Sequence, residues 1–280
     1  MSTPSLERDE VQRAVAQALD LAASLGASQA EAGASTERGL SVTVRLGEVE
    51  TLEYQQDRGL GITVYVGKRK GSASTADLSE RTVKETVEKA CSIARFTAED
   101  DCAGLADAEM MATDIQDLDL CHPWDIDAEG AIELARACES AGRGVDKRIN
   151  NSEGATISSH RARRVYGNSH GFLHGFESTS HSASCAMLAS QDNNMERDYW
   201  YTSARDAADL EDVEAVGRRA GERTVRRLGA RKLSTTRVPV IYPPELARGL
   251  IGHFSAAVRG GAQYRGSSLL LKADGDQIFP

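Results

Sequence analysis

Apolar residues recur every three to four positions in four segments of the chain, which predicts four amphipathic helices. Residues that suit helix ends flank these segments, with side-chain oxygens before them and glycines after them. The predicted helices lie between Pro4 and Gly26, after a cap at Ser79, after a cap at Asp125 or Asp127, and between Asp209 and Gly229.

Other segments alternate between apolar and polar residues, which predicts strands. Alternation over 40–46, 49–54 and 62–66, with glycines at the turns between these runs, predicts a meander of short antiparallel strands. The segment 149–191 is rich in serine, histidine and glycine and predicts several strands joined by tight turns. Val238, Val240 and Tyr242 predict one more strand.

These elements predict an α+β fold in several parts. Residues 1–98 form an N-terminal two-layer domain, with two helices on one face of the antiparallel meander. Residues 99–122 carry many acids without a sustained period and predict an acidic linker. Residues 123–235 form a second, central α+β domain, and residues 236–280 begin a third part of the chain.

The stretch Pro243–Leu271 predicts a helix that follows directly on the last strand. Pro244 suits the first helical turn, and Gly260 and Gly261 end the helix. One side is apolar, which predicts that the helix is buried, while Gly249 and Gly252 lie nearly opposite and predict close approach of another backbone. The apolar positions are Leu246, Leu250, Ile251, Phe254, Ala257 and Val258.

The charge, the cysteines and the N-terminal sequence indicate which binding partners and which cell compartment to expect. The net charge of −9 and the pI near 5.3 disfavour nucleic acid and anionic membranes, which need a basic face. Five widely spaced cysteines without a CxxC pair indicate reduced thiols. The N-terminus is charged before any apolar run, and no apolar stretch is long enough to span a bilayer, so we expect a cytoplasmic protein.

Three long motifs carry a resemblance to a known family: YGNSHGF (166–172), RDYWYTSARDAADLE (197–211) and the helix at 243–271. Together they resemble the PmbA/TldD family of bacterial peptide-processing proteins, on the PmbA (TldE) branch. In the TldD branch this helix is similar to HExxxH, a metalloprotease motif of two metal-binding histidines and a catalytic glutamate. The resemblance places Arg248 at the first histidine, Gly249 at the glutamate and His253 at the second histidine.

The resemblance therefore implies a chain without its own complete metal site. An arginine cannot replace an imidazole ligand, a glycine cannot act as a base, and His253 remains as a single remnant of the family's metal-binding helix. Zinc or a similar divalent metal is expected in a TldD-like catalytic partner, with unfolded or extended peptides as substrates. Family members continue well past Pro280 into a β-rich domain. The resemblance therefore also implies that residues 236–280 begin a metalloprotease-like C-terminal domain that is truncated in this sequence.

Two other patterns suggest chemistry. Gly167 to Gly171 reads GxSxG, the signature of a serine nucleophile, but glycines at 171 and 175 and alternation after Ser169 predict a strand instead of the required helix. His170, His174 and His181 suggest a zinc site. Glu177, the nearest carboxylate, has the opposite strand parity from His174, which favours surface or turn histidines.

Three functions remain open from the sequence. The first is the non-metal subunit of a heterodimeric TldD/TldE-type metalloprotease, which the resemblance favours. The second is a non-catalytic scaffold that binds extended peptides through sheet edges. The third is a serine hydrolase that uses Ser169.

Overall fold

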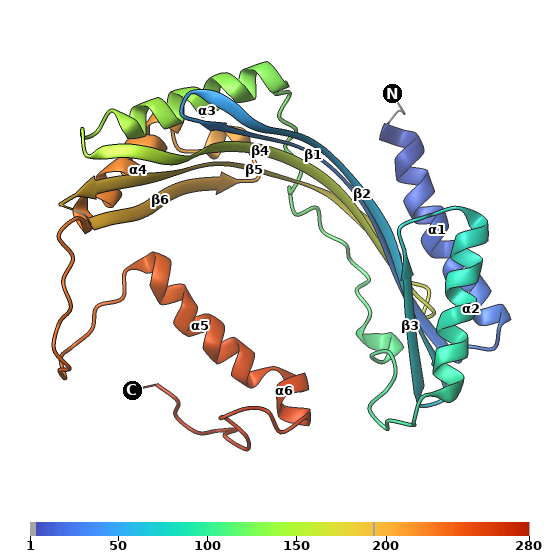
Figure 1. Cartoon of the computed structure of the whole chain (residues 1–280). Coiled ribbons are helices and arrows are strands. Elements are labelled where there is room, and N and C mark those ends of the chain that lie inside the picture. Colours follow the sequence, from blue (N-terminus) through green and yellow to red (C-terminus); the bar gives the residue numbers. More distant parts are fainter. Residues whose placement is uncertain (1–3, 193, 280) are drawn as a thin grey trace. The chain divides into compact units, whose positions relative to one another are not determined.

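The computed structural model describes residues 4–192 and 194–279, which fall into two units, residues 1–230 and 231–280. The first unit is built on one antiparallel sheet of six strands in the order β3-β2-β1-β4-β5-β6 (Figure 1). The strands are β1 (Gln29–Arg45), β2 (Glu48–Val66), β3 (Arg69–Thr75), β4 (Ile149–Asn168), β5 (Leu173–Gln191) and β6 (Asn194–Ala204).

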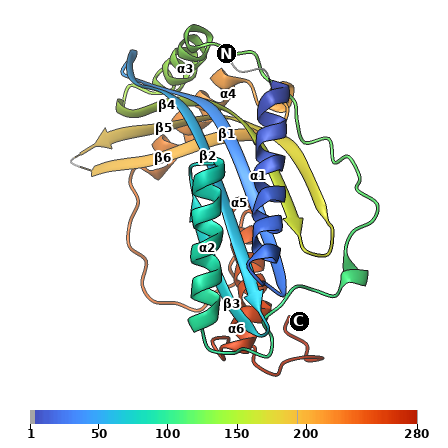
Figure 2. The ribbon, with the colours of Figure 1, turned by 90° about the vertical axis from the view of Figure 1, so that its right-hand side faces the viewer.

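Four helices cover one face of this sheet in two pairs. The first pair packs at one end and the second pair at the other, as Figures 1 and 2 show. Even-numbered residues of β1 face both pairs, because Ala30, Ala32 and Ala34 belong to the core under the first pair and Val42 and Val44 to the core under α3. The pairs are α1 (Pro4–Ser24) with α2 (Glu80–Phe96), and α3 (Ala128–Arg143) with α4 (Val213–Arg227).

The four predicted amphipathic helices and the antiparallel α+β fold class are confirmed. Ser79 and Asp127 occupy the N-cap positions of α2 and α3, and Asp127 accepts a hydrogen bond from the Gly130 N–H. The predicted inner faces are also buried, with Val83, Val87 and Ala90 on α2 as examples. The acidic segment between α2 and α3 contains only the short 3₁₀ turn Ala108–Met110 among the described elements, and a similar turn at Ala207–Asp209 precedes α4.

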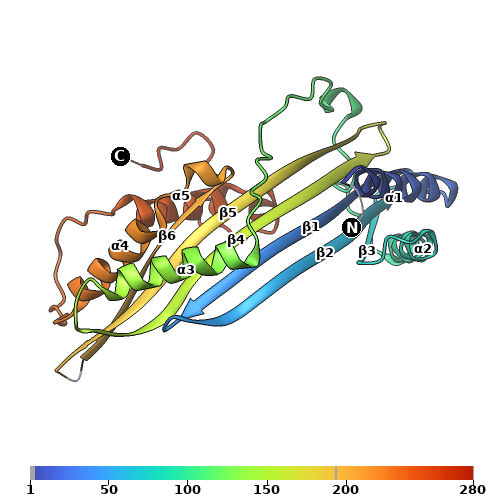
Figure 3. The same cartoon turned by 90° about the horizontal axis from the view of Figure 1, so that it is seen from above.

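The strands are longer and fewer than the sequence predicted. The segment 149–191 forms two long strands, β4 and β5, joined by one turn, so the prediction of several strands with several tight turns was wrong there. β1 pairs with β2 on one side and, from Glu31 to Val44, with β4 on the other. Residues 1–98 and 123–235, predicted as separate domains, therefore share a continuous sheet (Figure 3). Their boundaries stay predictions.

Close contact of two helix backbones occurs between α3 and α4. A Cβ added to Gly217 would lie 1.9 Å from the Cys138 carbonyl oxygen, and one added to Gly221 would lie 2.5 Å from the Gly142 carbonyl oxygen. Gly142 lies within α3, near its C-terminal end, and faces Gly217. Glycine is required at this crossing because any side chain would meet backbone atoms.

The second unit, residues 231–280, contains α5 (Pro244–Val258) and α6 (Gly260–Tyr264). The predicted helix is confirmed, but the strand over 238–242 was wrong. A strand needs a neighbour to accept and donate its backbone hydrogen bonds, and residues 231–279 as described contain no strand.

The predicted burial of α5 was also wrong for this unit. Leu246 and Ile251 on its apolar side are each 62% exposed, since the described unit offers no sheet to cover them. A Cβ at Gly249 or Gly252 would meet nothing within 4 Å. The close approach expected at these two glycines stays a prediction.

Candidate functional site

The GxSxG motif lies in the turn between β4 and β5. The Ser169 hydroxyl accepts a hydrogen bond from the Ala30 N–H at 3.0 Å, and the Ser169 N–H donates to the Ala30 carbonyl at 2.8 Å. β5 begins at Leu173, so a strand follows the motif, as predicted, and not the helix of a nucleophile elbow. Ser169 holds the turn against β1.

We expect Ser169→Ala to lower the free energy of unfolding by about 1 kcal/mol, because the Ala30 N–H loses its acceptor. Denaturant titration followed by tryptophan fluorescence measures this loss, and the exposed Ser180→Ala on β5 serves as the matched control. We also expect no covalent labelling of Ser169 by a serine-reactive phosphonate. Stoichiometric labelling that disappears in the Ser169 variant would restore the hydrolase hypothesis.

The three candidate zinc ligands of the central segment are not brought together. His170 lies in the β4–β5 turn, whereas His174 and His181 lie on β5 with opposite parity and so face opposite sides of the sheet. His181 is buried, with Nδ1 at 3.0 Å from Ser159 Oγ and Nε2 at 2.9 Å from the His122 carbonyl. It packs edge-on against Trp124. His181 is therefore a hydrogen-bonded core residue.

α5, on which the resemblance places the metal-binding motif, offers few donors here. α5 carries Arg248, Gly249 and His253 at the three motif positions, and the His253 side chain is exposed. Arg248 and His253 are five residues apart. On a regular helix, side chains at that spacing point about 140° away from each other, so they cannot both reach one metal ion. Across residues 4–192 and 194–279, no group of three or more histidine, cysteine or acidic side chains could hold a metal ion. The residues present do not fit a metal site.

Arginines on α4 and aromatic residues on β6 have structural partners. Arg218 lies 2.9 Å from Glu214 and Arg227 lies 3.4 Å from Glu196, so the arginine-rich face pairs with local acids. The Arg219 guanidinium stacks 3.6 Å from the centre of the Trp200 ring. The contacts of Arg219 and Arg227 bind α4 to β6.

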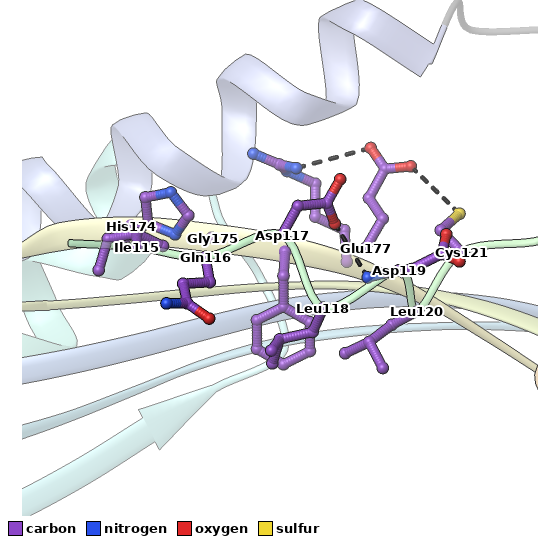
Figure 4. Close-up of a pocket in the computed structure, with 12 residues that line it drawn as sticks. Ile115, Gln116, Asp117, Leu118, Asp119, Leu120, Cys121, His174, Gly175 and Glu177 are labelled. Atoms are coloured by element: carbon purple, nitrogen blue, oxygen red, sulfur yellow. Dashed lines mark hydrogen bonds and ion pairs between the residues drawn. The ribbon is translucent and has the colours of Figure 1, made fainter.

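A cavity of about 580 Å³ lies between the acidic segment and the beginning of β5. Figure 4 shows Ile115 to Leu120 following the same course as His174 to Glu177. Asp117, Leu118 and Phe176 contribute to its lining. Sequence reasoning missed this site, because the acidic segment has no periodicity that would place it beside a particular strand. The only signal was the parity of Glu177, which predicted that it lies apart from His174.

Glu177 is the centre of the charges in this cavity. Arg161 Nη2 lies 2.6 Å and Arg163 Nη1 lies 3.5 Å from its carboxylate oxygens, and the Cys121 thiol donates to it at 3.8 Å. Burial raises the pKa of the Cys121 thiol, an effect that Arg161 opposes and Glu177 increases. The thiol is therefore protonated at neutral pH and is a poor nucleophile.

The acids of the segment differ in their partners. The Asp119 carboxylate lies 3.4 Å from His122 Nε2. A hydrogen bond with the Asp119 carbonyl raises the pKa of His122, and the Asp119 and Asp206 carboxylates add to that rise. The Asp117 carboxylate accepts a hydrogen bond from the uncharged Asp119 N–H. The cavity thus combines an apolar wall with the Asp117 carboxylate, which has no ion pair among those described, while Arg163 in the lining is paired with Glu177.

Known proteins are similar to this chain over its whole length. The family described as "PmbA/TldA metallopeptidase domain 1" matches residues 30–94, and "PmbA/TldA metallopeptidase central domain" matches 121–228. "Metalloprotease PmbA" of Escherichia coli O157:H7 is 47% identical over 100% of this chain and 62% of its own length. A PmbA homolog of Haemophilus influenzae is 46% identical over 98% of this chain and 60% of its own length. The chain thus spans about three fifths of these relatives.

Solved structures agree in fold. A Bacteroides thetaiotaomicron protein whose name links it to DNA gyrase matches with a TM-score of 0.85 and 24% identity, over 97% of this chain and 61% of that chain. TldE from Thermococcus kodakarensis matches with a TM-score of 0.67 and 17% identity, over 92% of this chain and 58% of that chain. In the described part of the chain, no helix has the length and apolar character to cross a membrane. On the two family matches and the PmbA identities, the chain belongs to the PmbA/TldD metallopeptidase family.

Proposed function

We propose that this chain is a PmbA/TldE-like subunit that binds peptides and acts in the cytoplasm beside a TldD-like catalytic subunit. The observation that carries this proposal is the identity of three positions on α5, Arg248, Gly249 and His253, where the TldD branch has HExxxH. The partner then supplies the zinc or similar divalent metal, and this chain supplies peptide-binding surface.

The chemistry of these positions supports a division of labour. Metal-assisted hydrolysis requires several neutral or anionic ligands and a base that accepts a proton from water. Arg248 carries a permanent positive charge, and Gly249 has no side chain. The membership in a metallopeptidase family and the poor ligand set are reconciled when a second subunit performs the cleavage.

A peptide-binding scaffold without any role in cleavage is the second candidate, and the cavity beside the exposed edge of β5 favours it. Reconstitution separates the two candidates. Peptide cleavage by a TldD-like protein that carries HExxxH is measured with and without this chain. A rate that depends on this chain supports the subunit, whereas peptide binding without any change in rate supports the scaffold.

We expect the purified chain to contain less than about 0.1 zinc per molecule after mild dialysis, because His253 is a single ligand. Elemental analysis measures this content. His253→Ala is the control and is expected to leave it unchanged. One tightly held zinc per chain that is lost in the His253 variant would contradict the assignment of the metal to the partner.

A further inference from the structure

The first half of β5 has an open edge. β4 pairs with β5 from Leu173 onward, whereas β6 pairs only with His181–Gln191. Within residues 4–192 and 194–279, no strand therefore flanks Leu173–Ser180 on the side away from β4. An open edge presents backbone donors and acceptors that can pair with another extended chain.

One contact shows that this edge accepts extended chain. The Thr179 N–H donates to the Leu120 carbonyl at 2.9 Å, and the Thr179 hydroxyl accepts from the His122 N–H at 2.9 Å. Because alternate residues of an antiparallel strand point their backbone groups to the same side, the N–H and C=O of Gly175 also point away from β4. Among the backbone hydrogen bonds described, none joins residues 115–119 to Leu173–Glu177, and the cavity of about 580 Å³ is lined by both stretches.

The walls of the cavity provide two kinds of recognition. Phe176 is 49% exposed and Leu118 is 69% exposed, and with Ile115 they form an apolar surface that a side chain can cover. Asp117 contributes negative charge, since its carboxylate accepts only an uncharged N–H among the hydrogen bonds described. Glu177 contributes little, because Arg161 and Arg163 neutralise it.

We propose that an extended peptide carrying a basic residue next to an apolar one binds in this cavity, as an added strand along Leu173–Glu177 of β5. The backbone of the peptide pairs with the edge, its apolar side chain covers Phe176, and its basic side chain approaches Asp117. This inference rests on the proposed function, because it names the place and the class of peptide that the chain binds.

The probe is a fluorescein-labelled octapeptide of alternating lysine and valine, titrated with the full chain by fluorescence anisotropy. We expect an otherwise identical peptide with glutamate in place of lysine to bind about tenfold more weakly, since it meets the acidic wall. N-methylation of alternate backbone nitrogens should also weaken binding about tenfold, because it removes donors for strand pairing. Equal binding of the N-methylated peptide would overturn the proposal.

Three variants locate the site on the chain. We expect Phe176→Ser to weaken binding about tenfold and Asp117→Asn about twofold to fivefold. Asp114→Asn, in the same acidic segment but outside the cavity lining, is the matched control and should bind as the unchanged chain does. Binding that is insensitive to both Phe176→Ser and Asp117→Asn would overturn the proposal.

Hydrogen exchange provides a readout that does not depend on the variants. Bound peptide should slow exchange of the Gly175 amide, while the amides of α2 serve as an internal reference. Unchanged exchange at Gly175 under saturating peptide contradicts the inference. If this chain still increases cleavage by the TldD-like partner in that case, the proposed function stands and the peptide binds elsewhere. If cleavage does not depend on this chain, the proposed function fails whatever happens at Gly175.

Discussion

Replacing Gly217 with alanine is expected to lower the free energy of unfolding of residues 1–230 by about 2–3 kcal/mol. The new Cβ would lie 1.9 Å from the Cys138 carbonyl oxygen and 3.1 Å from the Gly142 nitrogen. Both are backbone atoms of α3, so the two helices must move apart and the core beneath them must open. That core includes Val216 and Ala220 of α4 with Met187 of β5, all fully buried.

Tryptophan fluorescence during denaturant titration measures this loss, because both tryptophans, Trp124 and Trp200, belong to residues 1–230. The matched control is Gly252→Ala on α5. A Cβ there meets nothing within 4 Å, so alanine should be neutral or favour the helix by up to about 1 kcal/mol. A Gly217 variant as stable as the unchanged chain would show that the α3–α4 crossing is looser than the structure describes.

This contrast shows where a one-dimensional pattern stops being informative. Gly249 and Gly252 align on one side of α5, and Gly142 follows an apolar helical segment in the same way that many helix stops do. Helical periodicity reveals which residues share a face, but it does not reveal which face meets another backbone. The structure puts the close contact at Gly142, Gly217 and Gly221 and leaves the α5 glycines open.

The helices could be predicted because the buried residues of each helix recur with the period of an α-helix. On α2 the buried positions Val83, Val87, Ala90 and Ala94 are those that a 3.6-residue period selects. The same argument applies to Ala131, Ala135 and Cys138 on α3. Each helix packs one face on the sheet, so its apolar stripe and its core contacts coincide.

The full length of the strands was hidden by polar residues at the middle of the sheet. β1 continues through Thr36, Glu37 and Arg38, between its two buried ends, where neither helix pair covers it. The face opposite the helices is polar as well, with Ser41, Ser158, Ser182 and Ser203 side by side across four strands. Without apolar alternation, a sequence pattern divides such a strand into pieces, and it gives no sign that β1 pairs with β4.

The same limit explains the candidate peptide site. Its lining comes from an aperiodic segment and from a stretch of β5 that, in the described part of the chain, pairs with β4 alone. Strand parity correctly put Glu177 on the opposite face from His174, but the partners Arg161 and Arg163 come from β4, whose register the sequence does not specify. The alternation along a strand predicts which face of the sheet a side chain lies on. Its neighbours on that face depend on the register with the adjacent strand.

Glu139 shows how the two expected domains are joined. Its side chain is buried on α3, and its two carboxylate oxygens accept hydrogen bonds from the N–H groups of Leu46 and Gly47 at 2.7 and 2.8 Å. These two residues form the turn between β1 and β2, with φ values of 54° and 84°. Successive N–H groups in such a turn point together and create a site for an anion. α3 of the central segment therefore holds the tip of the N-terminal hairpin.

We expect Glu139→Ala to lower the free energy of unfolding by about 2–4 kcal/mol, since hydrogen bonds to a charged acceptor contribute about 1.5–3 kcal/mol each. Glu139→Gln retains one carbonyl oxygen and should lose about half as much. The control is Glu133→Ala, an exposed acid on the same helix, for which we expect a change within about 0.5 kcal/mol. Denaturant titration gives the three values, and hydrogen exchange of the Leu46 and Gly47 amides shows whether the turn itself has opened. If Glu139→Ala and Glu133→Ala are equally stable and both amides stay protected, the hairpin tip does not depend on α3, and the continuous sheet alone joins the two parts.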